Sequence, residues 1–199
     1  MRVTAISRQV KRQDRYSVYL DEKFAFGLSE SGLLKSGLYV GKELSQEEAA
    51  DLAAHVQTDK ALTAAINYLS YRSRSEWEMH DYLRRRKEIA PEVVDDVVAH
   101  LSDQGLLNDA QFAHNWVANR RLLKPTSNRK LRQELMQKHI NDSHITAALE
   151  EDADEEQALR AMIVKKRSKY PDQAKLMQYL ARQGFGYDAI KNALAHEPE

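Results

Sequence analysis

The chain of 199 residues has no cysteine, only four prolines and few aromatic residues, which make up 8% of it. Without cysteine it can form no disulfide and use no thiolate chemistry, which fits a reducing compartment. No run of about 18 apolar residues is present, which excludes a membrane-spanning helix. The first residues also lack the apolar stretch of a signal peptide. Composition therefore predicts a soluble, cytoplasmic protein.

Net charge is absent as well, because 30 basic and 30 acidic residues cancel. This balance argues against a generic binder of polyanions. The charges are nevertheless segregated. Six basic side chains lie in YRSRSEWEMHDYLRRRKE (71–88), and the acidic block EEDADEE (150–156) precedes KKRSK (165–169). Such blocks are most often solvated helix surface, and a docking surface is the alternative.

Signatures of catalysis are missing too. The chain contains no glycine-rich phosphate loop, no nucleophile elbow and no dinucleotide fingerprint. Its seven histidines are scattered, without the helical spacing of a zinc site. We expect no catalytic residue, no metal ligand and no cofactor, and a hydrolase has no supporting set of residues. The chain is predicted not to be an enzyme.

The first 43 residues differ from the rest and predict a small β-rich extension. VTAISRQV, RYSVYL and KFAFGL are short, partly alternating and rich in β-branched and aromatic residues, as half-buried strands are. Asp21-Glu22 is placed to form a hairpin turn between the second and third. Four of the seven glycines then fall within residues 27–41, so we expect no helix through that stretch.

From Leu44 onward the pattern is helical. Ser45 and Glu48 have the spacing of a capping box, which predicts a connecting helix over residues 44–60. Ser73 or Ser75 is placed to cap a second helix. Pro91 fits the first turn of another, because that position needs no N–H donor. Asn108 is read as a further helix cap.

An internal repeat is the most informative feature of the chain. The template positions are Leu131, Leu135, Ile140, Ile145 and Leu149. A second copy at a constant offset is Leu176, Leu180, Phe185, Ile190 and Leu194. A third, with one residue inserted, is Met79, Leu83, Ile89, Val94 and Val98. An apolar helix pattern precedes each copy, so the repeat predicts three-helix units over residues 61–110, 111–157 and 158–199.

The spacing within a unit has a physical reason. Positions four apart, such as Leu131 and Leu135, share one face of a helix. Ile140, in the turn that follows, can plug the open end of the helix pair. One unit buries too little surface to be stable alone, so neighbouring units should stack. We expect a mostly α fold of tandem three-helix repeats in an elongated curved array, with a compact bundle as the alternative.

Four ordered segments carry a resemblance to a known family: YRSRSEWEMHDYL (71–83), DQGLLNDAQFAHNWVANR (103–120), LRQELMQKHI (131–140) and YLARQGFGYDAI (179–190). They resemble the RecX family, bacterial regulators of the RecA recombinase. The β-rich front is similar to an extension of longer members. His139 stands where a glycine is frequent, and Gln111 stands where an arginine is frequent, which removes one possible phosphate or carboxylate contact.

The resemblance implies a regulatory function without catalysis. RecX-like proteins bind RecA along the groove of its filament on DNA and mainly inhibit DNA repair, strand exchange, ATP hydrolysis and co-protease activity, the last linked to the SOS response. The implied partners are RecA and the RecA–DNA filament, with a possible weak contact to DNA, no membrane and a monomeric protein. The alternative is a free-standing DNA-binding regulator.

Basic residues recur beside the same helix pair in all three units, so stacked units could align them into a stripe facing phosphates or acidic patches. Dipole-stabilising cations at helix ends are the structural alternative. The predicted contact residues are Arg72, Arg74, Arg84, Arg85, Arg120, Arg121, Lys124, Arg129, Lys130, Lys165 and Lys166.

Overall fold

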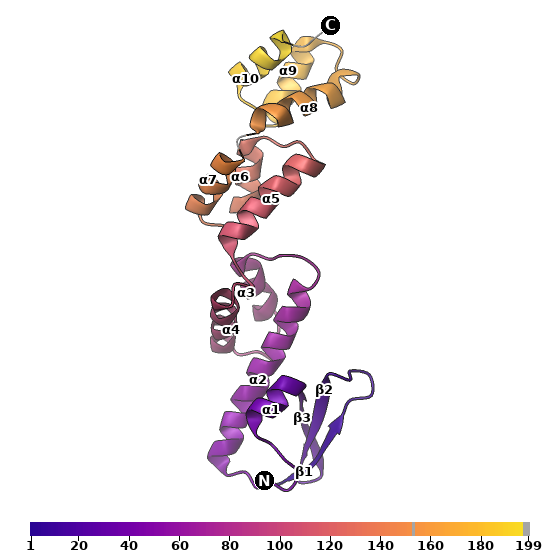
Figure 1. The fold of residues 1–199 in the computed structure, drawn as a ribbon, viewed down its shortest axis with the longest axis vertical. Helices are drawn as coiled ribbons and strands as arrows, with labels where there is room; N and C mark the ends of the chain where they lie inside the picture. The colour runs from indigo at the N-terminus through magenta and orange to yellow at the C-terminus, as the bar shows by residue number, and fades with distance from the viewer. Residues whose placement is uncertain (153, 197–199) are drawn as a thin grey trace. The chain divides into compact units, whose positions relative to one another are not determined.

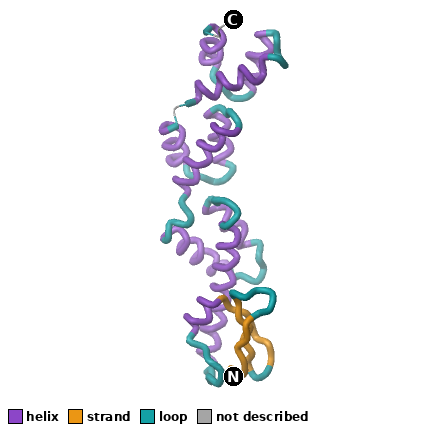
Figure 2. Tube along the Cα trace, turned by 45° about the vertical axis from the view of Figure 1, so that its right-hand side comes forward, coloured by secondary structure: helices purple, strands orange, loops and turns teal. Residues whose placement is uncertain are grey.

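The computed structural model describes residues 1–152 and 154–196. It divides into two compact units, Met1–Leu107 (unit 1) and Asn108–Glu199 (unit 2). Helices dominate both, and the strands are confined to the beginning of unit 1 (Figures 1 and 2). The predicted fold class, a mostly helical chain with a small β-rich N-terminal part, is confirmed.

The sheet of unit 1 consists of β1 (Val3–Arg8), β2 (Arg15–Leu20) and β3 (Lys23–Ser29). The strands are antiparallel in the order β1-β2-β3. Leu20 pairs with Lys23, and the two residues between them have positive φ, 47° at Asp21 and 66° at Glu22. Positive φ at both central positions is the form that suits a two-residue hairpin, so the predicted turn is confirmed.

The glycine-rich stretch is not free of helix, and that prediction is wrong. Helix α1 (Glu30–Ser36) runs through it, capped by Ser29 and ended by Gly37 at a φ of 60°. Position 32 within this helix requires glycine, because a Cβ there would come within 2.3 Å of Asp59 Oδ1. This requirement comes from a residue far along the chain.

Asp59, a buried acid of helix α2 (Gln46–Leu69), connects that helix to the sheet and to α1. Its Oδ2 accepts a hydrogen bond from Ser29 N at 2.8 Å, and Ser29 Oγ donates to its Oδ1. Arg15 Nη2 lies 3.6 Å from the carboxylate and donates to the Gly27 carbonyl at 3.0 Å. The two charged side chains are each only 9% exposed. They form a buried ion pair at the meeting point of the elements.

Helix α2 (Gln46–Leu69) is one continuous helix that serves two cores. The Ser45–Glu48 capping box that opens it is confirmed. Leu52 and Val56 pack with the sheet residues Val3, Val18 and Leu28. The second half of the helix instead contributes Ala61, Ala64 and Ala65 to a different, wholly helical core.

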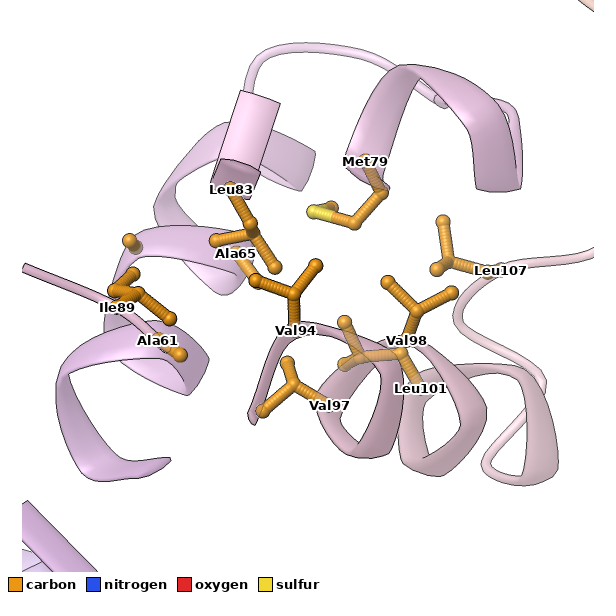
Figure 3. Packing of buried hydrophobic residues seen from close by; sticks show 11 residues of the cluster. Ala61, Ala65, Met79, Leu83, Ile89, Val94, Val97, Val98, Leu101 and Leu107 are labelled. Atoms are coloured by element: carbon orange, nitrogen blue, oxygen red, sulfur yellow. The ribbon is translucent and has the colours of Figure 1, made fainter. Parts of the chain in front are cut away.

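That second core belongs to the first three-helix unit, completed by α3 (Glu76–Arg84) and α4 (Pro91–Asp103). Ser75 rather than Ser73 caps α3, and Pro91 lies in the first turn of α4 as predicted. Met79 and Leu83 of α3 face Val94 and Val98 of α4 (Figure 3). All four side chains are buried.

Unit 2 contains two further three-helix groups. The first has α5 (Asp109–Leu123), α6 (Asn128–Met136) and α7 (Asp142–Glu151), and the second has α8 (Glu155–Arg167), α9 (Gln173–Arg182) and α10 (Tyr187–Ala195). Asn108 caps α5 as predicted. Each group encloses its own apolar core. The tandem three-helix repeat is confirmed, while its expected stacking into a curved array stays a prediction.

The turn after the second helix of each group places one apolar side chain, the plug, into the core. The plugs Ile89, Ile140 and Phe185 are 7%, 5% and 4% exposed. The residue before the plug has a φ of 58° at His139 and 94° at Gly184. Left-handed backbone is costly for histidine and free for glycine. Gly184 has a second role, because a Cβ there would come within 2.6 Å of Ser127 Oγ.

Along residues 1–152 and 154–196, no helix is both long and apolar enough to cross a membrane. Over the same ranges, no three histidine or acidic side chains gather closely enough to hold a metal ion.

Replacing Asp59 by alanine should destabilise unit 1 by about 3–5 kcal/mol, because it leaves Arg15 buried without its partner. Urea unfolding followed by Trp77 fluorescence in a Trp116→Phe background would measure this. Asp51→Ala, an exposed acid on the same helix, is the matched control and should change little. Equal losses in both variants would contradict the role given to the buried pair.

Gly184→Ala should destabilise unit 2 by about 2 kcal/mol or more, because alanine resists left-handed backbone and its Cβ meets Ser127. Gly186→Ala is the control, since that glycine has a φ of −68° and open space around it. Thermal unfolding followed by circular dichroism distinguishes the two. A neutral Gly184→Ala would show that the turn is not constrained as described.

Candidate partner-binding site

Four of the predicted contact residues surround one concave site in unit 2. Lys124, Lys130, Lys165 and Lys166 line a cleft of about 300 Å³, which we call the lysine cleft. They come from the α5–α6 connection, from α6 and from α8. The fold therefore brings together two pairs of lysines that lie far apart in the sequence.

Helix α6 supplies one wall of the lysine cleft through the spacing of its polar residues. Lys130, Gln133, Glu134 and the C-cap residue Gln137 all line the cleft; Gln133 and Glu134 lie three and four residues after Lys130, and Gln137 lies three residues after Glu134. Such intervals place side chains on a single face of a helix. The opposite face of α6 carries Leu131 and Leu135, both buried. The amphipathic pattern of α6 thus presents this polar wall.

Hydrogen bonds between the two three-helix groups of unit 2 hold the walls in place. Ser127, fully buried, caps α6 and donates from its Oγ to the Gln183 carbonyl at 2.7 Å. Lys130 Nζ donates to Gln183 Oε1. Asn128 N donates to Glu155 Oε1 at 2.8 Å. The cleft is therefore bounded by directed contacts as well as by packing.

The acidic residue that lines the cleft, Glu134, is engaged by other partners. Its Oε2 accepts from Trp116 Nε1 at 2.9 Å and from Arg120 Nε at 2.8 Å. In the described part of the chain, no carboxylate pairs with any of the four lysines. Four ammonium groups around a concave surface therefore create a positive potential that its own carboxylate does not cancel.

Apolar side chains form part of the lining. Met162 and Phe185 are 7% and 4% exposed and belong to the core beneath. Tyr179 also lines the cleft, and its ring stacks on Tyr170 with centroids 4.9 Å apart. Burial, and to a lesser degree Tyr170, raises the pKa of the Tyr179 phenol. The lining thus joins cations to an apolar, uncharged surface.

The predicted arginines of unit 1 are engaged within the fold. Arg72 makes two hydrogen bonds of 2.9 Å to Glu78, which raise its pKa against the opposing effect of burial. Arg74 lies 3.7 Å over the ring of Tyr68. Arg84 pairs with Asp95 at 3.1 Å and Arg85 pairs with Asp81 at 2.7 Å. These contacts favour structural roles for the four arginines.

The arginines of unit 2 divide into two kinds. Arg120 is bound to Glu134, and its guanidinium lies 5.0 Å from the centre of the Trp116 ring. Arg121 is 10% exposed, lies 3.4 Å from Asp152 and donates to the Thr126 carbonyl. Arg129 is exposed. The structure thus brings Lys124, Lys130, Lys165 and Lys166 together and leaves the other seven predicted residues outside the cleft.

A second hollow, in unit 1, was not expected from the sequence. This aromatic hollow, of about 570 Å³, has a mixed basic and aromatic lining that includes Arg12, Lys60, Arg86, Phe24 and Tyr71. Phe24 and Tyr71 are 60% and 83% exposed. Among these residues, Tyr71 and Arg86 had a signal in the sequence, because they lie in the basic segment 71–88. Arg12 and Lys60 lie outside the repeat and had none.

Comparisons with known proteins agree with this architecture. Family models match in order along the chain: the regulatory protein RecX N-terminal domain over residues 1–45, and the first, second and third RecX three-helix domains over residues 61–101, 108–149 and 154–194. The regulatory protein RecX of Leuconostoc mesenteroides is 33% identical over 195 residues, covering 94% of this chain and 72% of the relative.

Solved structures give the same result. A crystal structure of regulatory protein RecX is similar with a TM-score of 0.77 and 28% identity, covering 98% of this chain and 99% of the other. The crystal structure of RecX from Lactobacillus salivarius is similar with a TM-score of 0.64 and 27% identity, covering 70% of this chain and 95% of the other. Both are structures of RecX proteins.

Truncation to alanine should change the free energy of unfolding by different amounts at two of the predicted contact residues. Arg121→Ala should lower the free energy of unfolding by about 2–3 kcal/mol, because it leaves Asp152 and buried acceptors without their donor. Arg129→Ala should change it by less than about 0.5 kcal/mol, as an exposed substitution does. Urea titration of both variants measures the difference. If Arg121→Ala were as stable as the unchanged protein, the structural role given to Arg121 would be wrong, and Arg121 would again be a candidate for contact with a partner.

Proposed function

Since the chain belongs to the RecX family of regulatory proteins, we propose that it regulates the RecA recombinase, mainly as an inhibitor. In this proposal it binds the RecA filament on DNA and limits repair, strand exchange, ATP hydrolysis and co-protease activity. It acts in the cytoplasm as a monomer without a catalytic step of its own.

The observation that carries the proposal is the lysine cleft. Its four lysines have no carboxylate partner in the described residues, and they lie in a concave surface that also presents apolar side chains. Such a surface fits a negatively charged partner that offers shape as well as charge. Contact with the filament there would be steric and electrostatic, obstructing its extension without any chemical reaction.

The alternative function is a free-standing DNA-binding regulator that acts through a stripe of basic residues without RecA. The aromatic hollow favours it, because exposed rings beside cations are the usual platform for single strands. Its cations are partly engaged, however. Arg15 pairs with Asp59 at 3.6 Å and Arg86 lies 3.7 Å from Glu88. This lowers the positive charge that the hollow offers.

Charge reversal in the cleft tests the proposed function. Lys124→Glu with Lys165→Glu should raise the concentration needed for half-inhibition of RecA ATP hydrolysis about tenfold, since each exposed pair lost is worth up to about 1 kcal/mol. The assay titrates the protein into preformed RecA filaments on single-stranded DNA. Both lysines are exposed, so the fold should tolerate the change.

The matched control is Lys175→Glu with Lys191→Glu, two exposed lysines of unit 2 outside the cleft. It should inhibit like the unchanged protein. If the unchanged protein had no effect on RecA ATP hydrolysis, the proposed function would be wrong. Tight, salt-sensitive binding to oligothymidine alone, abolished by Lys60→Glu, would establish the DNA-binding alternative instead.

A further inference from the structure

We propose that the lysine cleft binds an acidic peptide segment, and that the carboxylates and one apolar side chain of the peptide make the contacts. The inference rests on the proposed function only in taking that segment to belong to the regulated protein. The partner has two chemical features. Its carboxylates pair with the four lysines, which we call the rim, and an aliphatic or aromatic group contacts the apolar lining of Pro125, Met162 and Phe185, which we call the floor.

The positive groups enclose the cleft from more than one element. Lys124 precedes α6 and Lys130 lies on it, whereas Lys165 and Lys166 project from the last turn of α8. Lys130 is held by Gln183 Oε1, and Lys166 lies 5.8 Å from the centre of the Tyr179 ring. Lys124 and Lys165 are exposed. An acidic segment lying in the cleft would therefore meet cations from both three-helix groups.

The floor explains why charge alone does not describe the site. Half-buried Pro125 lines the cleft, together with the small parts of Met162 and Phe185 that are exposed. Methionine is suited to such a floor because its flexible thioether adapts to different side chains. An apolar group of the partner would gain burial here.

Size and ring geometry favour a peptide over nucleic acid. A volume of about 300 Å³ lies at the small end of ligand pockets and suits a side chain with its neighbours. Single-strand sites instead present free ring faces along several nucleotides. Here the Tyr179 ring is stacked on Tyr170 with an angle of 24° between them, and Phe185 is 4% exposed. One face of Tyr179 is thus covered and Phe185 is buried, so the cleft presents no run of free ring faces to successive bases.

The test measures fluorescence anisotropy of a labelled synthetic peptide, a central leucine flanked by aspartates and glutamates, titrated with the full-length protein. Binding should saturate and should weaken about tenfold in the Lys124→Glu, Lys165→Glu protein. Replacing the leucine of the peptide by serine should weaken binding by a similar factor, because the floor then loses its apolar partner. Lys175→Glu with Lys191→Glu should leave binding unchanged.

Three results would overturn the inference. One is no binding of the acidic peptide at low salt. Another is equal binding of the leucine and serine peptides, which would reduce the cleft to a charged patch. The third is oligothymidine bound more tightly than the peptide and lost in the same cleft variant, which would make nucleic acid the occupant. Because RecA is absent from the assay, peptide binding without any effect on RecA filaments would refute the proposed function alone.

Discussion

The core of each three-helix group depends on one apolar side chain, the plug, which the turn after the second helix buries in that core. Ile89, Ile140 and Phe185 occupy that place and are buried. In two of the groups the backbone reaches it through left-handed conformation, and the plug N–H then bonds back to the helix, Ile140 to Leu135 O and Phe185 to Leu180 O. Each such side chain contributes about 1.5–3 kcal/mol through burial, a large share of the stability of so small a core.

Arginine and lysine have separated roles on this scaffold. All of the predicted arginines except the exposed Arg129 contact internal partners, as Arg72 does with Glu78 and Arg120 with Glu134. The planar guanidinium suits such bidentate or stacked contacts. The lysines of the cleft point their charges into a surface hollow instead. Internal cohesion and partner contact therefore draw on different basic residues, although the sequence intermingles them.

Much of the fold could be predicted because it is encoded by local spacing. Leu131 and Leu135 are both 0% exposed, as positions four apart on one helix face require. The serine caps followed from side-chain chemistry within three residues. Helix α1 was missed although Ser29 and Gly37 cap it locally, because the glycines around it were taken to exclude a helix. The reason for a glycine at position 32, the approach of Asp59, carries no local signal.

The candidate site was only partly predictable for the same reason. Charge patterning identified Lys124, Lys130, Lys165 and Lys166, but it gave equal weight to Arg121, which the fold encloses. Whether a basic side chain meets a partner within the fold depends on residues such as Asp152 and Glu134, whose positions follow from tertiary packing. In the neutral lining, Phe185 is a repeat position, whereas Gln183 carries no signal in charge or repeat.

Helix α2 imposes a constraint on how this chain can vary in length. Its first half faces the sheet through Leu52 and Val56, and its second half faces α3 and α4 through Ala61 and Ala65. Inserting or deleting one residue between them would rotate one half against the other by about 100°. The angular phase between the two faces is thus fixed, and viable insertions in this stretch should come in steps of about seven residues, close to two full turns.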